Sequence, residues 1–135
     1  MDGVVAVRTV LKADGALIAL VPSARIFNGP APLGTTLPFI MLESVSKNDR
    51  NISAPGPKRF VRQRVQVTVV ASGDVQRQAV LRAVRHAAAD QINPTVTGLA
   101  SVTIHTDGAG PDFFDDDYSG WRGSQDFMTK YSETR

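Results

Sequence analysis

The alternation of apolar and polar residues is clearest between residues 59 and 71. The apolar positions of this stretch fall on one face of an extended chain, and they are Val61, Val65, Val67, Val69 and Ala71. The polar positions between them are Arg62, Arg64, Gln66 and Thr68. A period of two residues predicts a strand with one face on a core and the other toward water or a partner, as an antiparallel sheet allows.

Apolar residues recur at helical spacing in two stretches. In residues 4–21 they are Val4, Val7, Val10, Leu11, Leu17, Ile18 and Val21. This pattern predicts a helix, a break at Asp14-Gly15 where Asp14 caps a second short helix, and an end at Pro22. A further helix is predicted from Asp74, acting as its cap, to about Gln91. Its buried stripe is Val80, Leu81, Val84, Ala87 and Ala88, and Arg77, Arg82, Arg85 and Asp90 lie mostly outside.

Shorter apolar segments predict the remaining strands, at 25–27, 37–45, 98–106 and 121–131. Between them, the polar residues 47–58 predict a long loop or mobile arm, and residues 108–120 predict an acidic loop. We therefore expect a single α+β domain spanning residues 1–135. Its mainly antiparallel β-sheet of four to five strands should carry two main helices packed on one face.

Composition narrows the class of protein. The 135 residues suit one domain. They include no cysteine, which excludes disulfides, thiolate nucleophiles and cysteine-ligated zinc. No apolar run approaches the roughly 20 residues that cross a bilayer. The N-terminus lacks the basic start and apolar core of a secretory signal. We expect a soluble protein made in a cytoplasm, without a membrane partner.

The net charge of +2 hides a strong segregation of charges. Residues 47–64 are rich in bases with Asp49 as their only acid, whereas residues 107–117 hold five acids and no base. Oppositely charged patches can complement a second copy of the chain or two different neighbours. We predict a subunit or partner interface made of Lys47, Arg50, Lys58, Arg59, Arg62, Arg64, Asp112, Asp115, Asp116 and Asp117.

Catalytic chemistry finds little support. The two histidines, His86 and His105, accompany no Gly-x-Ser-x-Gly nucleophile motif. A phosphate-binding Gly-x-x-x-x-Gly-Lys-Ser/Thr motif is absent, and Gly108-Ala109-Gly110 is followed by Pro111, which removes a backbone donor. We expect neither an enzyme nor a bound cofactor.

Two binding alternatives remain open. Residues Asp115, Asp117, Ser119, Gly120 and Asp126 occupy positions one, three, five, six and twelve of an EF-hand-like loop. Aspartate at position twelve, Arg122 at position eight and a strand at the exit favour a solvated or partner-facing loop, so we expect no metal. The basic stretch could instead neutralise nucleic-acid phosphates. Phe60 is its only aromatic residue, which argues against a surface that stacks bases.

A set of short segments also follows a recognisable order along nearly the whole chain. They are Leu11-Lys12-Ala13-Asp14, Leu17-Ile18-Ala19-Leu20-Val21, Arg25-Ile26-Phe27, Pro30-Ala31-Pro32, Leu37-Pro38-Phe39-Ile40, Arg64-Val65-Gln66-Val67 and Ser124-Gln125-Asp126-Phe127. Together with the helix from Asp74, this order resembles the tail-completion or tail-terminator (tail-to-head joining) proteins of long-tailed bacteriophages. Gene transfer agents and tail-like particles carry similar proteins.

The resemblance implies a structural virion protein of the head–tail junction, made in the host cytoplasm. Such proteins form a ring, typically a hexamer, that caps the tail tube, stops its polymerisation and docks the head–tail connector. The implied partners are copies of the chain itself, the tail tube protein and the head–tail connector or adaptor protein, with DNA only passing through the ring. The alternatives are another head–tail connector, a minor tail component or a small basic nucleic-acid-binding module.

Overall fold

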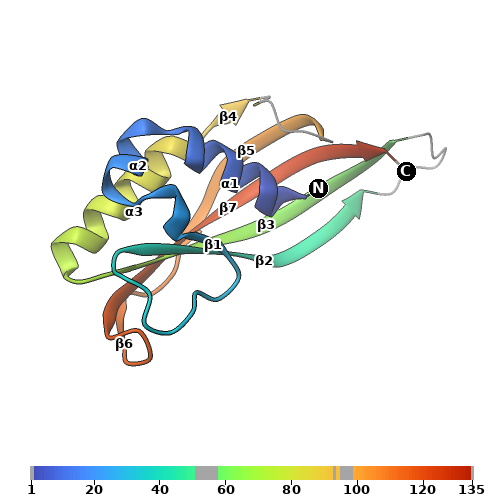
Figure 1. Cartoon of the computed structure of the whole chain (residues 1–135). Coiled ribbons are helices and arrows are strands. Elements are labelled where there is room, and N and C mark those ends of the chain that lie inside the picture. Colours follow the sequence, from blue (N-terminus) through green and yellow to red (C-terminus); the bar gives the residue numbers. More distant parts are fainter. Residues whose placement is uncertain (1, 51–57, 93, 95–98, 135) are drawn as a thin grey trace.

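The computed structural model describes residues 2–50, 58–92, 94 and 99–134. Within them, three α-helices lie on one face of a single twisted sheet (Figure 1). The elements in chain order are α1 (Gly3–Ala13), α2 (Gly15–Leu20), the 3-10 turn η1 (Ser23–Arg25), β1 (Ile26–Asn28), β2 (Phe39–Arg50), β3 (Lys58–Ala71), α3 (Asp74–Ala88), β4 (Gln91–Ile92), β5 (Ala100–Ala109), β6 (Phe113–Asp115) and β7 (Gly120–Thr134).

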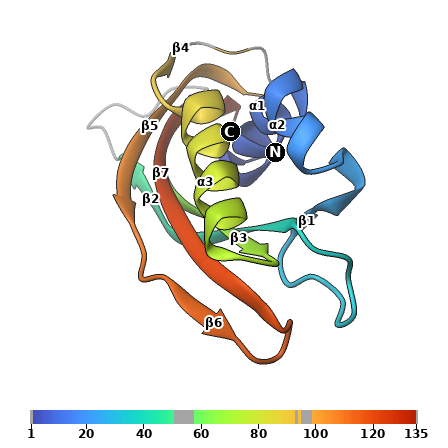
Figure 2. The same ribbon diagram turned by 90° about the vertical axis from the view of Figure 1, so that its left-hand side faces the viewer.

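The sheet is built around the two longest strands, β3 and β7. Its strand order is β1-β2-β3-β7-β5-β4, and β6 pairs with β7 beyond the end of β5. Every pairing is antiparallel except that of β1 with β2. Seen along its length, the sheet curves around α3 (Figure 2). This architecture confirms the predicted α+β class, and the two unpredicted strands, β4 and β6, are only two and three residues long.

Side-chain caps explain where the first two helices begin. The Asp2 carboxylate accepts hydrogen bonds from the Val4 and Val5 backbone N–H groups at 3.0 and 3.2 Å. Asp14 accepts one from the Leu17 N–H at 2.9 Å, so the predicted break and second cap are confirmed. The predicted cap of α3 is wrong, because Gly73 is its N-cap and Asp74 lies in its first turn. That helix ends at Ala88, and Gln91 already pairs in β4.

The main core lies between the helices and the inner face of the sheet. It contains four of the five apolar residues predicted on one face of β3, all but Ala71, together with Leu11, Leu17, Val80, Val84 and Phe127. Ala71 is also fully buried. A second, smaller core lies on the outer face, where residues 29–38 cross the sheet. It consists of Ala31, Phe39, Met41 and Val70. Thr68, predicted on a polar face, is therefore buried at this end of β3.

A buried polar network fixes the start of α1 to the sheet. The Gln63 side chain, 1% exposed, accepts hydrogen bonds at Oε1 from the Gly3 N–H (2.8 Å) and the Tyr131 hydroxyl (3.0 Å). Its Nε2 donates to Ser44 Oγ at 2.9 Å. Thr129 Oγ1 donates to the Gln63 carbonyl at 2.9 Å. Because buried polar groups are costly unless paired, this network specifies one position for the helix.

Gly3 provides the first test of this arrangement. A Cβ at this position would collide with Thr129 Oγ1 and come within 2.9 Å of Gln63 Oε1. We expect Gly3→Ala to lower the free energy of unfolding by about 1–3 kcal/mol, as overpacking does. Urea denaturation measures the change. Gly15→Ala is the matched control, since a Cβ there meets nothing within 4 Å, and an equal loss in both variants would contradict the prediction.

Tyr131 provides a second test, through pH. Burial raises the pKa of Tyr131 to about 12, and the charges of Glu133, Asp2 and Asp49 add to the effect. The folded chain then holds the phenolic proton more tightly than the unfolded chain, whose tyrosines titrate near pH ~10. This contribution to stability is complete below pH ~10 and is lost as the pH rises toward 12.

We therefore expect the free energy of unfolding of the natural chain to fall more steeply between pH ~10 and ~12 than that of Tyr131→Phe. Denaturation by urea across this range measures both slopes. At neutral pH the variant should lose about 1 kcal/mol, because a hydrogen bond to Gln63 is removed. Parallel pH profiles would show that ionisation of Tyr131 does not oppose folding.

Candidate functional site: the two ends of the sheet

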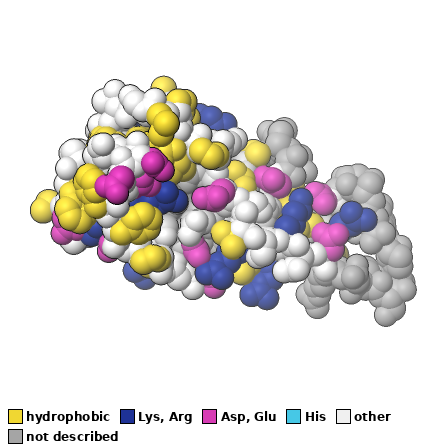
Figure 3. All heavy atoms as spheres, turned by 90° about the horizontal axis from the view of Figure 1, so that it is seen from below, with side chains coloured by type: hydrophobic (Ala, Val, Ile, Leu, Met, Phe, Trp, Pro, Cys, Tyr) yellow, Lys and Arg dark blue, Asp and Glu magenta, His cyan; other side chains and the backbone are white. Residues whose placement is uncertain are grey.

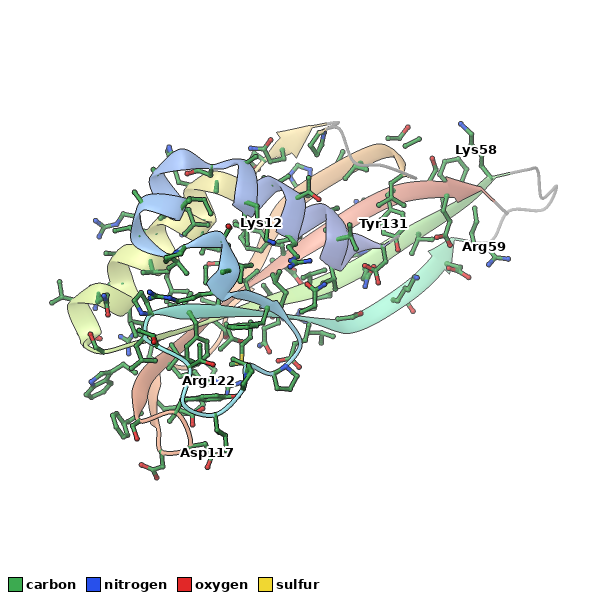
Figure 4. The ribbon with its side chains drawn as sticks, in the orientation of Figure 1. Lys12, Lys58, Arg59, Asp117, Arg122 and Tyr131 are labelled. Atoms are coloured by element: carbon green, nitrogen blue, oxygen red, sulfur yellow. The ribbon has the colours of Figure 1, made fainter. Side chains whose placement is uncertain are left out.

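Most of the predicted interface residues lie toward opposite ends of the long strands, and Arg64 lies in the middle of β3. Figure 4 shows Lys58 and Arg59 at one end and Asp117 and Arg122 at the other. We call the first end the basic tip, made of Lys47, Lys58, Arg59, Arg62 and Lys130. We call the second the hairpin end, made of β6, residues 116–119 and the first residues of β7.

The backbone at both ends is more regular than predicted. Residues 47–50 of the predicted arm continue β2, and Lys58 begins β3. The rest of the arm, residues 51–57, lies outside the described residues. The predicted acidic loop is partly extended, because it contains the end of β5, all of β6 and the first residue of β7. Strand pairing therefore holds the charged segments at both ends.

At the basic tip, the side chains of Lys47, Lys58, Arg59 and Arg62 are exposed. Arg59 Nε lies 3.8 Å from Asp49 Oδ2, a contact between two solvated groups that contributes little to stability. Arg62 and Lys130 are cross-strand neighbours, so two positive charges stand side by side. Arg50 ends β2 here, and its side chain lies outside the described part.

Arg64 is held within the sheet. Its Nη2 and Nε donate to Asp126 Oδ2 at 2.6 and 3.0 Å, and Nε lies 3.2 Å from Asp107 Oδ2. These bonds join β3 to β7 and β5. The hydrogen bond and the charge of Asp126 raise the pKa of Arg64 above its ordinary value. A partner would have to compete with these contacts, whereas Arg62 points a free charge at solvent among the described residues.

Two of the predicted acids at the hairpin end also have internal partners. Asp112 lies 3.3 Å from Arg77, whose side chain is 5% exposed and packs over Gly123. Arg77 was predicted outside, and it is buried because Gly123 leaves room for it against β7. Asp115 Oδ2 accepts a 2.9 Å hydrogen bond from Arg122. Asp116 and Asp117 are exposed on the turn.

Asp115 shapes the turn that follows it. Its Oδ1 accepts hydrogen bonds from the Asp117 and Tyr118 N–H groups at 3.0 and 3.3 Å. Burial alone would raise the pKa of Asp115, but the Arg122 guanidinium and these two N–H groups outweigh it, and the pKa is lowered. Tyr118 in turn donates its hydroxyl to the Ala31 carbonyl at 2.8 Å. The carboxylate therefore organises the hairpin.

The EF-hand-like spacing does not produce a metal-binding geometry in the described residues. Asp115 and Asp126, the first and last positions of that pattern, each bind an arginine of the chain. Among the side chains that the structure places, no three histidines or acids converge as metal ligands would. The two histidines sit on the surface, and His105 Nδ1 lies 3.2 Å from the exposed Asp90.

Sequence reasoning missed three exposed aromatic residues at the hairpin end. Phe114 and Trp121 are directly opposite each other on β6 and β7, with ring centroids 5.6 Å apart in an edge-to-face arrangement. Arg122 stacks over Phe113 at 5.5 Å. Figure 3 shows hydrophobic side chains gathered at this end of the molecule. The available signal was Phe113-Phe114, a pair of bulky apolar residues inside an otherwise acidic and glycine-containing segment.

No helix in the described ranges has the length and apolar character needed to span a bilayer. The two ends of the sheet present contrasting surfaces, basic at one end and acidic and aromatic at the other.

The same fold occurs in a solved structure. A chain of a structure titled "Virion of native gene transfer agent (GTA) particle" shares the fold, with a TM-score of 0.65 and 18% sequence identity. The likeness covers 97% of this chain and 99% of that chain. No curated protein matches the sequence.

A match to a family model, of nearly the same extent as the structural likeness, shows the family. The model of the family described as "Tail completion protein gp17" matches residues 5–132, from the first turn of α1 to the last residues of β7. The matched range includes both ends of the sheet and the whole of the two cores. The chain therefore belongs to the tail completion protein gp17 family, and it is a structural protein of the virion tail.

Proposed function

We propose that the chain assembles with copies of itself into a ring that caps the tail tube, stops its polymerisation and docks the head–tail connector. The family match over residues 5–132 carries this proposal. The fold shared along its whole length with a chain of a gene transfer agent virion supports it. The proposed ring contains six copies, and its neighbours are the tube protein and the connector. DNA passes through the ring.

The distribution of charge supports a role in assembly. Exposed bases lie at one end of β3 and exposed acids lie beyond its other end, at Asp116 and Asp117. A head-to-tail contact between unlike surfaces generates a ring when its rotation closes. Two chemically different ends also suit a component that meets different neighbours on its two sides.

The geometry offers no comparable support for catalysis. In the part of the chain that the structure describes, His86 is an exposed residue of α3, and the ionisable partner of His105 is the exposed Asp90. An activated nucleophile needs a base within hydrogen-bond reach and a third group that orients the base. We therefore propose that the protein acts by binding other proteins rather than by catalysing a reaction.

Particles made without this chain test the proposal directly. We expect tail tubes of uncontrolled length that carry no heads, because nothing ends the tube or provides the docking surface. Electron microscopy of the particles measures both properties. Complete particles of normal tail length would contradict the proposal. Normal tube length with unattached heads would instead favour another head–tail connector.

Charge reversal tests the predicted interface. We expect Arg62→Glu, or Asp116→Lys with Asp117→Lys, to reduce the yield of complete particles about tenfold or more, because like charges then face each other. Arg64 and Asp115 are unsuitable targets, since their reversal breaks internal pairs. Arg82→Glu is the matched control, an exposed reversal on α3 that belongs to neither the basic tip nor the hairpin end. Equal yields from all these variants would show that the charges are only solvated.

A further inference from the structure

The basic tip contains a pocket that the described side chains leave open. It has a volume of about 390 Å³ and is lined by Phe60, Val61, Arg62, Lys130 and Tyr131 among others. Its walls come from consecutive rungs of β2, β3 and β7, because Asn48, Arg62 and Lys130 are cross-strand neighbours and Asp49, Val61 and Tyr131 form the next row. Successive rows face opposite sides of the sheet, and Val61 and Tyr131 are buried in the core. The exposed part of the pocket therefore combines the Phe60 ring, 45% exposed, with the positive charges of Arg62 and Lys130 and the acid Asp49.

The hairpin end carries a projecting group of matching character. We call Phe114 and Trp121 the aromatic knob, and their side chains are 48% and 39% exposed. Their edge-to-face contact keeps the rings in one orientation. The exposed acids Asp116 and Asp117 follow on the adjoining turn. Exposed aromatic residues of this kind are the groups that most often dominate protein interfaces.

The knob and the pocket cannot meet within one molecule. Both include a residue of β7, Trp121 in the knob and Lys130 in the pocket. These residues are nine positions apart, or roughly 30 Å of extended strand. The continuous pairing of β7 with β3 from Ala71–Trp121 to Lys58–Thr134 holds them at that separation. A contact between them has to be intermolecular.

We propose that the aromatic knob of one copy inserts into the tip pocket of the next copy, with Asp116 and Asp117 facing Arg62 and Lys130. This inference rests on the proposed self-assembly and names its contact. The acids of the knob and the bases of the pocket have opposite signs, so a second copy of this chain supplies the complementary partner. The contact is head-to-tail, and every subunit uses both of its ends when the chain of contacts closes.

Site-directed cross-linking tests the contact, because the chain contains no cysteine of its own. We expect Asp117→Cys mixed with Lys130→Cys to give a disulfide-linked dimer under mild oxidation. The matched control is Asp117→Cys mixed with Arg82→Cys, which places the second thiol on α3 and should give no more than background. The cross-link is sought both in purified protein and in assembled particles. Equal yields in the two mixtures would overturn the proposal, as would a cross-link from Asp117→Cys to a different tail protein.

A charge exchange provides a second, independent measurement. We expect Asp116→Lys with Asp117→Lys to weaken self-association about tenfold or more by light scattering, and Arg62→Glu with Lys130→Glu to do the same. A chain carrying all four substitutions restores opposite signs across the contact and should regain association. Recovery also shows that the variants fold. The contact would be overturned if the chain with all four substitutions associated no more tightly than either double variant, while the circular dichroism spectra of all variants stayed unchanged.

The Trp121→Ala variant tests whether the aromatic knob contributes to the contact. We expect association to weaken about tenfold or more, because a buried tryptophan is a frequent determinant of interface affinity. Leu33→Ala is the matched control, since Leu33 is 73% exposed and lies on neither the knob nor the pocket. Equal effects of the two substitutions would place the contact elsewhere.

The outcomes separate this inference from the proposed function. Rings that form without the cross-link, and that Trp121→Ala leaves intact, would overturn the knob-and-pocket contact while the capping role stands. Cross-linked rings together with normal particles made in the absence of the chain would instead overturn the capping role while the contact stands.

Discussion

The pairing of β3 with β7 is the constraint on which the rest of the structure depends. These strands are hydrogen-bonded neighbours from Lys58–Thr134 to Ala71–Trp121 without a register shift. The inner face of the pair carries the core, and its two ends carry the pocket and the aromatic residues. A continuous ladder of this length allows neither end to move far without breaking hydrogen bonds along the strand. The paired backbones of β3 and β7 therefore fix the distance between the two charged ends.

The helices cover this ladder through apolar packing and one polar anchor. Packing alone would tolerate small shifts of α1 along the sheet, because apolar contacts are not directional. The hydrogen bonds of Gln63 with Gly3 and Tyr131 are directional and buried, and they select one position. The missing side chain of Gly3 allows the helix backbone to approach that closely. Sequence position 63 thus interrupts an apolar face of β3 for a structural reason.

Much of this fold could be predicted from local patterns. The alternation in β3 and the break at Asp14 are set by short-range physics, strand pleating in one case and helix capping in the other. The burial of Arg77 could not be predicted in the same way, because it depends on Gly123, which is distant in sequence. Asp115 is a similar case, since its internal role depends on Arg122 across the hairpin. The segregation of charges along the sequence was enough to predict two charged regions. Which of these charges are exposed and which are paired inside the protein could be seen only in the tertiary structure.

The Tyr118 hydroxyl joins two segments that are 87 residues apart in the chain, the turn after β6 and the stretch before β2. The Phe39 ring packs edge-to-face on Tyr118, with centroids 5.0 Å apart, and adds an apolar contact to that bond. Displacement of the turn would therefore strain the hydrogen bond to Ala31 and pull on residues 29–38. A mechanical load on the hairpin would be transmitted in this way to the outer face of the sheet, and the two surface segments would respond as one unit.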